Sequence, residues 1–458
     1  MSIFMKGLNM ELKKNEEIIV DIIDMGIEGE GIAKIDNFPI FIKQAIIGEK
    51  IKTKIIKVNK NYAIGIISEI IEKSENRVEP FCKVYKKCGG CNLQHLEYSK
   101  QLEYKKNVVK NNFRKFGLDE NKIKEIIGME NPFEYRNKAQ YPFGIDKDGN
   151  PITGFYANRS HNIIENDICK IEHSYSEKIV KEILDLVKKN NITIYNEETN
   201  KGYLRHVVIK VGFSTNDIMV IFVTNSKENK LKNIIDELLK NNQNIKTIVQ
   251  NINTKNTNVI LGDKNITLYG NGYIQDKLGE YTFNISPLSF YQINPIQTKK
   301  LYDKVKEYMG ENVDVLFDLY CGIGTIGMYC SQNAKQLYGI EIIPDAIKDA
   351  KENAKINNIE NANFYVGEAE NTIDDLYNKG IYADVVIVDP PRKGLDKRLI
   401  DVLLEKQPKK IVYVSCNNAT LSRDLQLLKE KYKLVECTLF DLFPHTSHVE
   451  TIALLCRE

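Results

Sequence analysis

The last third of the chain alternates between short apolar runs and amphipathic helical segments. Between residues 313 and 458 the strand-like runs are VDVLFDLY, QLYGIEI, ANFYVG, ADVVIVDPP and KIVYVSC, and helical patterns separate them. Two more strand-like runs, KLVECTLFDLF and ETIALLC, close the chain. Such alternation predicts a doubly wound, mostly parallel sheet of the α/β class with a final hairpin. Ligands of such sheets bind beyond the carboxyl ends of the strands.

A glycine-containing turn follows the first of these strands. Asp318 opens the segment DLYCGIG, whose glycines permit a tight turn and the close approach of a cofactor. Glu341 ends the second strand about twenty residues further on, where an acidic residue can bond a ribose hydroxyl. The turn resembles the S-adenosylmethionine site of class I methyltransferases.

Cys416 ends the strand next to the DPPRKG motif, which begins at Asp389. Taken alone, such a cysteine is more often buried and inert. Glu450 precedes the last strand and could return to the same edge of the sheet. A thiolate that adds to carbon 6 of uracil makes carbon 5 nucleophilic toward a methyl donor. A base must then remove the carbon 5 proton, so these residues suit uracil methylation.

Six segments between residues 285 and 451 together resemble the RNA uracil-C5 methyltransferase family: ISPLSFYQINPIQ, DLYCGIGTIG, YGIEI, VDPPRKG, VSCNNATLSRD and DLFPHTSHVE. The resemblance implies that Cys416 is the nucleophile and Glu450 the general base. The donor-binding residues that it implies are Gln292, Tyr320, Glu341 and Asp389. The family's usual SCNP reads SCNN here, so Asn418 replaces a proline.

A cysteine group stands upstream of these motifs. Cys82, Cys88 and Cys91 have the spacing C-x5-C-x2-C, and the fourth cysteine, Cys169, is solitary and distant. Four thiolates can hold either a zinc ion or an iron–sulfur cluster, and the spacing alone leaves both open. Family members with this pattern hold a 4Fe-4S cluster. The resemblance therefore implies such a cluster here, with these four cysteines as its ligands.

Residues 16–71 contain five short β-rich runs that Gly- and Asn-rich turns separate. This pattern predicts a small barrel of the OB type. The segment GEGIAKIDNFPIFIKQAIIGEKIK resembles a TRAM domain, which implies RNA binding, although such a barrel could also only pack on its neighbour. Family members that combine a TRAM domain with the cysteine pattern modify large-subunit ribosomal RNA. The resemblance therefore implies a uridine of 23S ribosomal RNA as the substrate.

The middle of the chain, residues 133–290, carries β-like runs and one helical stretch at 175–189, which predicts a mostly antiparallel α+β domain. Six polar residues there could line an RNA groove or face water: Arg136, Lys138, Arg159, His161, Arg205 and His206. A basic helix is expected at about 97–116. The basic residues around it include Lys105, and the tyrosines among them include Tyr85 and Tyr104. These residues suit phosphate contacts and base stacking, or a solvated helix face.

The 458 residues predict more than one domain. We expect a TRAM/OB-like barrel at 12–72, a central iron–sulfur and RNA-binding domain at 73–284, and an S-adenosylmethionine-dependent methyltransferase domain at 285–458, on which the basic helix packs. The net charge of +2 confines any nucleic-acid surface to a local patch.

No apolar run is long enough to span a bilayer, and the polar lead-in of about 15 residues lacks a signal-peptide core. We therefore expect a cytoplasmic monomer that binds RNA and no membrane. The alternatives are a transfer-RNA uridine-C5 methyltransferase and a non-catalytic RNA-binding assembly factor.

Overall fold

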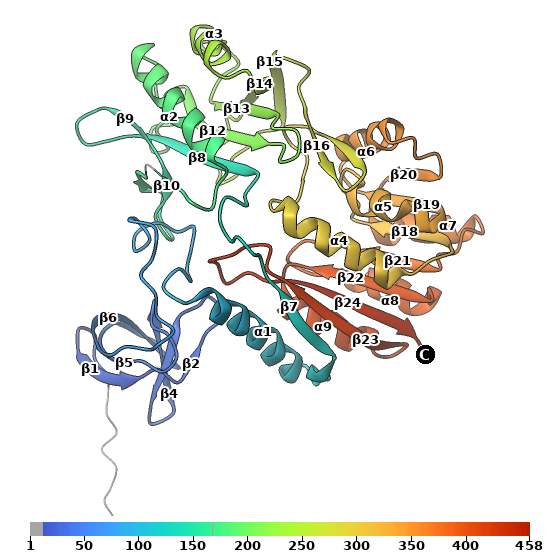
Figure 1. Cartoon of the computed structure of the whole chain (residues 1–458), viewed down its shortest axis with the longest axis horizontal. Helices are drawn as coiled ribbons and strands as arrows, with labels where there is room; N and C mark the ends of the chain where they lie inside the picture. The colour runs from blue at the N-terminus through green and yellow to red at the C-terminus, as the bar shows by residue number, and fades with distance from the viewer. Residues whose placement is uncertain (1–11, 167) are drawn as a thin grey trace, which may run out of the picture. The chain divides into compact units, whose positions relative to one another are not determined.

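The computed structural model describes residues 12–166 and 168–458, and the chain divides into two compact units (Figure 1). The first unit comprises the described residues up to Tyr85, together with Gly90–Val108 and His445–Ser447. The second comprises Lys86–Gly89, Val109–Pro444 and His448–Glu458. Most of the polar lead-in, residues 1–11, lies outside the described residues.

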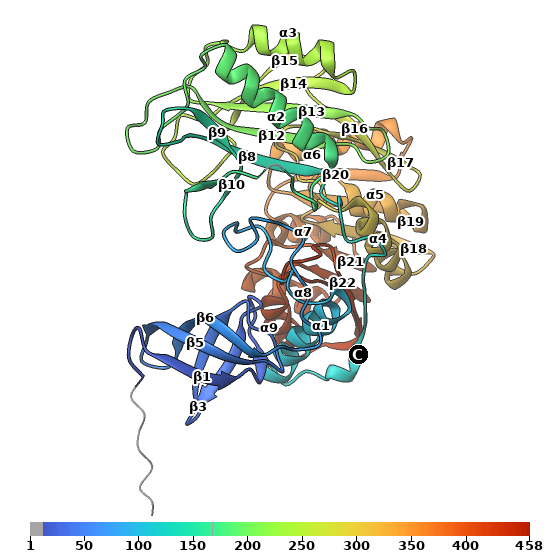
Figure 2. The ribbon, with the colours of Figure 1, turned by 60° about the vertical axis from the view of Figure 1, so that its left-hand side comes forward.

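The first unit is built on a six-stranded sheet of order β1-β5-β6-β4-β3-β2 that curls around one apolar core (Figure 2). Its strands are β1 (Glu17–Asp21), β2 (Asp24–Met25), β3 (Gly31–Ile35), β4 (Phe38–Lys43), β5 (Lys50–Val58) and β6 (Ala63–Glu72). Along β5, Ile51, Thr53 and Ile55 are buried and the lysines between them are not, which is the period of a half-buried strand. The predicted small barrel is confirmed. It has six strands because the first β-rich run breaks between β1 and β2.

Helix α1 (Tyr98–Lys115) forms where the basic helix was expected. Lys105 is fully buried, however, and Tyr85 and Tyr104 are only 4% and 6% exposed. The Tyr85 hydroxyl bonds a histidine ring nitrogen at 2.6 Å, and the Tyr104 hydroxyl donates to the carbonyl of Gly26 at 2.7 Å. The prediction that these three side chains contact RNA is therefore wrong, because they pack inside the first unit.

A six-stranded sheet of order β15-β14-β13-β12-β8-β9 organises the middle of the second unit. Its strands are β8 (Lys138–Ile145), β9 (Pro151–Thr153), β12 (Leu204–Val211), β13 (Ile218–Thr224), β14 (Ile245–Ile252) and β15 (Lys264–Tyr269). Every neighbouring pair is antiparallel except β13 and β14. Two short hairpins accompany the sheet: β10 (Phe155–Tyr156) with β11 (Ile163–Ile164), and β16 (Ile274–Leu278) with β17 (Tyr281–Ile285). The mostly antiparallel central domain is confirmed.

Helices α2 (Ser174–Lys189) and α3 (Lys232–Asn241) pack on one face of this sheet and share its apolar core (Figure 2). Helix α2 was expected, whereas the shorter α3 was not. Arg205 and His206 on β12 are 4% and 6% exposed, so the expectation that they line a groove or face water is wrong. The Arg205 guanidinium instead donates to the carbonyls of Asn253 and Lys255 at 2.8 and 2.9 Å.

The C-terminal sheet has eight strands in the order β20-β19-β18-β21-β22-β24-β23-β7. Its strands are β7 (Ile123–Ile127), β18 (Val313–Leu319), β19 (Ala334–Glu341), β20 (Ala362–Val366), β21 (Val385–Val388), β22 (Lys410–Ser415), β23 (Tyr432–Phe440) and β24 (Glu450–Arg457). The five strands from β20 to β22 are parallel, and β24 runs antiparallel between β22 and β23. The predicted doubly wound sheet with a final hairpin is confirmed.

Helices cover both faces of the C-terminal sheet. The helices that follow the central domain are α4 (Pro295–Met309), α5 (Thr325–Cys330), α6 (Pro344–Ile356), α7 (Ala369–Asn378), α8 (Lys397–Lys406) and α9 (Asn418–Leu428). One apolar core receives side chains from α7, α8 and α9, and a second receives them from α4, α5 and α6.

Two elements far upstream also belong to the C-terminal sheet region. Strand β7 pairs in parallel with β23. Val109 and Phe113, from the end of α1, are buried in the core under α7, α8 and α9. The end of the basic helix therefore packs on the catalytic region, as the resemblance implies. The three predicted domain boundaries stay a prediction.

Candidate functional site

Three of the predicted residues stand where neighbouring parallel strands end. Tyr320 follows β18, Glu341 is the last residue of β19, and Asp389 follows β21. Strand β18 lies between β19 and β21, so all three residues come to one edge of the sheet. This is the edge at which ligands of doubly wound sheets bind.

The predicted nucleophile and base reach the same edge from strands of opposite direction. Cys416 directly follows β22, and Glu450 is the first residue of β24. Because these strands are antiparallel, the start of one lies beside the end of the other, and Ser415 pairs with Thr451. Glu450 is therefore level with Cys416 across the ladder.

A pair of hydrogen bonds bends the chain around Cys416. The Ser415 hydroxyl donates to the carbonyl of Asn417 at 3.0 Å, and the Asn417 N–H donates back to that hydroxyl at 3.1 Å. The Asn417 side-chain oxygen caps α9 by accepting the N–H of Ala419 at 3.1 Å. The residues on either side of the cysteine are thus fixed, and Cys416 itself stays half-buried.

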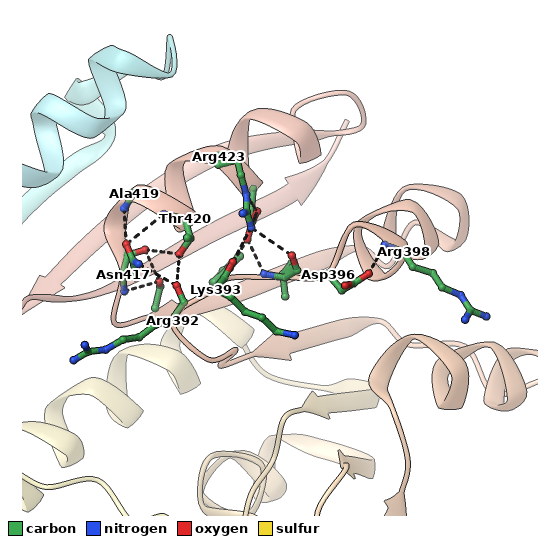
Figure 3. Close-up of polar contacts among 12 residues, drawn as sticks. Arg392, Lys393, Asp396, Arg398, Asn417, Ala419, Thr420 and Arg423 are labelled. Atoms are coloured by element: carbon green, nitrogen blue, oxygen red, sulfur yellow. Dashed lines mark hydrogen bonds and ion pairs between the residues drawn. The ribbon is translucent and has the colours of Figure 1, made fainter. Parts of the chain in front are cut away.

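The DPPRKG loop is tied to this turn through its main chain (Figure 3). The Arg392 carbonyl accepts the Asn417 side-chain N–H at 3.0 Å and the Thr420 hydroxyl at 3.2 Å. Arg423 donates to the Lys393 carbonyl at 3.0 Å. Figure 3 shows that the Arg392 side chain extends away from these contacts. The DPPRKG loop and the turn at Cys416 therefore form one hydrogen-bonded structure, which the sequence pattern did not predict.

Gly394 closes the loop in a left-handed conformation with φ of 78°. A Cβ added there would lie 2.5 Å from a carboxylate oxygen of Asp424. That carboxylate is fully buried and accepts the N–H of Leu395 at 2.8 Å and the Tyr413 hydroxyl at 2.7 Å. Glycine is therefore required at this position for both conformation and space.

The site holds several acidic groups away from water, and their pKa values shift accordingly. Burial, together with repulsion from the Glu450 and Asp389 carboxylates, raises the pKa of the Cys416 thiol to about 11. Burial and the Asp389 charge raise the pKa of Glu450 to about 8. The Arg392 guanidinium acts in the opposite direction on both pKa values. Near neutral pH the thiol and Glu450 are thus mainly protonated, and Arg392 favours their ionised forms.

The turn after β18 leaves room at the strand ends. Tyr320, Gly322 and Gly324 all have positive φ, and a Cβ added to Gly322 would meet no atom within 4 Å. The Gly322 N–H donates to the Glu341 carboxylate at 3.2 Å. Asp318 supports the turn from below, since it is buried and accepts the Gly327 N–H at 2.8 Å. This geometry suits the close approach of a ligand with ribose hydroxyls.

Gln292, the fourth predicted donor-binding residue, lies in a different segment, which links β17 to α4. Its side chain is largely buried, and its carbonyl accepts the Asn137 side-chain N–H at 2.9 Å. The donor-binding roles of Gln292, Tyr320, Glu341 and Asp389 stay a prediction.

The position where the family has proline lies in the first turn of α9. Asn417 is the N-cap of the helix, and Asn418 is its first residue, where proline is well tolerated. The Asn418 side-chain oxygen accepts the Asn112 side-chain N–H from α1 at 2.5 Å. This chain therefore has a side-chain contact where the family has a rigid ring.

We predict that Asn418→Pro keeps methyltransferase activity within about threefold of the wild type, because the change removes one part-buried side-chain hydrogen bond, which contributes about 1 kcal/mol to stability. The measurement is kcat on the RNA substrate, with the melting temperature as a check on folding. A decrease in kcat of more than about tenfold would mean that the Asn112 contact is needed to hold the turn at Cys416.

The four predicted cluster ligands, Cys82, Cys88, Cys91 and Cys169, are each half-buried. Within residues 12–166 and 168–458, no three His, Cys, Asp or Glu side chains form a group that could hold a metal ion. The described geometry therefore gives no support to the predicted set of four ligands, and their assignment stays a prediction.

In the part of the chain that the structure describes, no helix has the length and apolarity needed to cross a membrane.

Residues 97–458 match the tRNA (uracil-5-)-methyltransferase family, and residues 11–67 match the TRAM domain. An uncharacterized RNA methyltransferase of Clostridium acetobutylicum is 52% identical over 97% of this chain and 98% of that protein. A second, from Clostridium tetani, is 48% identical over 98% of each.

Among solved structures, the Pyrococcus abyssi tRNA (uracil-54, C5)-methyltransferase in complex with S-adenosyl-L-homocysteine has a TM-score of 0.77. It is 29% identical, and the similarity covers 96% of this chain and 100% of that one. The class I fold, the N-terminal TRAM domain and the resemblance are confirmed: this chain belongs to the tRNA (uracil-5-)-methyltransferase family of S-adenosylmethionine-dependent RNA methyltransferases.

Proposed function

We propose that this enzyme methylates carbon 5 of a uridine in 23S ribosomal RNA through a covalent bond between Cys416 and carbon 6 of the uracil. The observation that carries the proposal is the register of β22 and β24, which brings Cys416 and Glu450 to one edge of the sheet. The same edge receives Tyr320, Glu341 and Asp389, the proposed donor-binding residues.

The proposed reaction uses the two side chains in turn. The Cys416 thiolate adds to carbon 6 of the uracil, and the electron pair that is displaced makes carbon 5 a nucleophile. Carbon 5 takes the methyl group of bound S-adenosylmethionine, whose bond between sulfur and methyl breaks to leave S-adenosylhomocysteine. The ionised form of Glu450 then removes the carbon 5 proton, which restores the double bond between carbons 5 and 6 and expels the Cys416 thiolate. The base is thus needed only after the methyl group has been transferred.

The pH dependence of this reaction should follow the thiol. Because the pKa of Cys416 is about 11, only its minor ionised form can add to uracil, and kcat/KM should rise by about tenfold per pH unit between pH 6 and 9. Arg392→Gln removes the cation that favours the thiolate, so kcat/KM at pH 7 should fall by about tenfold, with partial recovery at higher pH.

The matched control is Lys393→Gln, which removes the charge of the next residue in the loop. The bond from Arg423 is to the main-chain carbonyl of Lys393, so the substitution keeps it. It should leave the pH profile unchanged. If kcat/KM of the wild type did not change between pH 6 and 9, ionisation of the Cys416 thiol would not limit the reaction, and this prediction would be contradicted.

The assignment of ribosomal RNA rests on the combination of the barrel with the C-x5-C-x2-C pattern, which the resemblance associates with large-subunit enzymes. The similarity to the Pyrococcus abyssi tRNA methyltransferase covers 96% of this chain, which supports transfer RNA as a second candidate substrate. The overall architecture therefore does not separate the two.

Methyl transfer to bacterial 23S ribosomal RNA fragments and to transfer RNA transcripts decides between them. We expect 5-methyluridine, identified by mass spectrometry, in a ribosomal fragment with kcat/KM about 100-fold above that for any transfer RNA. The reverse ratio would assign transfer RNA, and product in neither RNA would reject both.

We further propose that Cys82, Cys88, Cys91 and Cys169 ligate a 4Fe-4S cluster. Thiolates are the ligands of such clusters. Methyl transfer requires no external electron donor, so we propose that the cluster serves folding and RNA binding.

RNA modification also supports a cytoplasmic location, and we propose that the enzyme is a monomer.

Protein purified without oxygen should contain about four iron and four sulfide ions per chain, and Cys88→Ser should lower both. Cys456→Ser, at another half-buried cysteine, is the control and should leave them unchanged. Zinc in place of iron and sulfide would reject the cluster.

A further inference from the structure

The turn at residues 286–289, between β17 and α4, is held by two charged side chains of opposite sign. The Lys210 ammonium on β12 donates to the carbonyls of Ser286 and Ser289 at 2.8 and 3.0 Å. One carboxylate oxygen of Asp349, on α6, accepts the hydroxyls of the same two serines, the Ser289 contact being 2.6 Å long. A cation thus holds the main chain of the turn, and an anion holds its side chains.

Lys210 is an unusual residue for this place, since it is only 6% exposed. Taking an ammonium out of water is unfavourable unless hydrogen bonds and an opposite charge offset the loss. Burial and the neighbouring Lys138 lower the pKa of Lys210 to about 7, and the Asp349 charge opposes this shift. An apolar side chain would avoid this cost but could not donate hydrogen bonds to the two carbonyls. We therefore attribute the buried lysine to its contacts with the 286–289 turn.

The turn leads directly into the proposed donor site. Gln292 lies three residues after Ser289. Asn137 bonds the carbonyls of both Gln292 and Ile293, each at 2.9 Å, so the segment is fixed beyond the turn as well. At the other side, Asp349 belongs to the helix that follows Glu341 and β19. The contacts of Asp349 with the 286–289 turn therefore connect two segments that carry proposed donor-binding residues.

We propose that Lys210 and Asp349 are positioning residues for the methyl-donor site, because together they fix the 286–289 turn that leads to Gln292. The proposal rests on the proposed function and deepens it. Neither residue needs to touch the donor, since both act through the turn.

The test compares Lys210→Met and Asp349→Asn with the full-length wild type. Titration calorimetry with S-adenosylhomocysteine should give a Kd about tenfold higher for each variant, and KM for the donor should rise similarly. KM for RNA should stay within about twofold. The double variant should resemble the single ones instead of multiplying their effects, because both residues act on one turn.

Arg205→Met is the matched control. Arg205 is a second buried cation on β12 that also donates to two carbonyls, but those belong to Asn253 and Lys255. Its replacement should lower the melting temperature and leave the Kd for S-adenosylhomocysteine unchanged. Ser289→Ala removes one Asp349 contact without altering a buried charge, so it keeps the test decisive if Lys210→Met does not fold. It should raise Kd about threefold.

Equal donor affinity in the wild type, Lys210→Met and Ser289→Ala would overturn the positioning role and leave the proposed function intact. A loss of affinity in Arg205→Met as large as in Lys210→Met would also overturn it, because general destabilisation would then explain both. No binding of S-adenosylhomocysteine by the wild type would instead reject the proposed function, and the positioning role with it.

Discussion

Cys416→Ala is expected to abolish uridine methylation, with a loss of at least about 10⁴-fold in kcat. Without the thiolate, carbon 5 of uracil has no means of becoming nucleophilic. The fold should persist, because the half-buried Cys416 lies in a turn that its neighbours Ser415 and Asn417 hold. RNA binding should therefore survive.

The measurement that we would make uses RNA in which the target uridine is 5-fluorouridine. Fluorine on carbon 5 cannot be removed as a proton is, so the wild type with S-adenosylmethionine should form an adduct that survives a denaturing gel. Mass spectrometry should place it on Cys416, and Cys416→Ala should form none.

Cys456→Ala is the matched control for this experiment, because Cys456 is also half-buried and lies on β24, opposite Lys410 at the far end of β22. It should form the adduct normally. Turnover by Cys416→Ala, or an adduct on another residue, would refute the covalent mechanism proposed here.

Glu450→Gln is expected to stop the reaction after methyl transfer. The amide cannot accept the carbon 5 proton, so the methylated uracil should stay bonded to Cys416, and kcat should fall by about 10³-fold. Ordinary uridine RNA should then give a protein–RNA adduct that the wild type does not accumulate. A denaturing gel with labelled RNA detects it, and labelled donor shows that its uracil is already methylated.

The control is Glu436→Gln on β23. The Glu436 carboxylate accepts the Tyr308 hydroxyl at 2.8 Å, and Glu436 is not one of the proposed site residues. It should turn over normally. If Glu450→Gln turned over slowly without any adduct, either the base would be another residue or Glu450 would act before methyl transfer.

The same substitution should change stability in a pH-dependent way. The pKa of Glu450 is raised from 4.5 to about 8 by folding, so the folded chain binds the proton more tightly than the unfolded chain does. This contribution to stability is present below pH 4.5 and is lost as the pH rises through about 8. Relative to the wild type, Glu450→Gln should therefore gain on the order of a few °C in melting temperature by pH 8.5 and almost nothing at pH 4.5.

The sequence was sufficient to predict the sheet and its ligand-binding edge, because strand–helix alternation and strand ends are local patterns. Cys416, Asp389 and Glu341 could be placed there for that reason. The pairing of Ser415 with Thr451 could not be read in the same way, since register depends on contacts between segments.

Burial was the property that local patterns predicted least well. Lys105 and Arg205 looked like surface cations, yet both are inside the chain. Nothing in the local sequence marks Lys210 as buried, although its ammonium donates to two carbonyls of the turn before Gln292. Such residues are recognisable only when tertiary structure supplies their acceptors, which lie about 50 to 80 positions away in the sequence.

The hydrogen-bond ladder between β22 and β24 sets the separation of Cys416 and Glu450, the proposed nucleophile and base, in discrete steps. Sliding one strand along the other by a residue moves its side chains by about 3.3 Å and turns them to the opposite face of the sheet. Smaller changes in the distance between Cys416 and Glu450 can therefore come only from movement of their side chains. An enzyme with this architecture can accept sequence changes in its loops and barrel while the spacing of Cys416 and Glu450 stays the same.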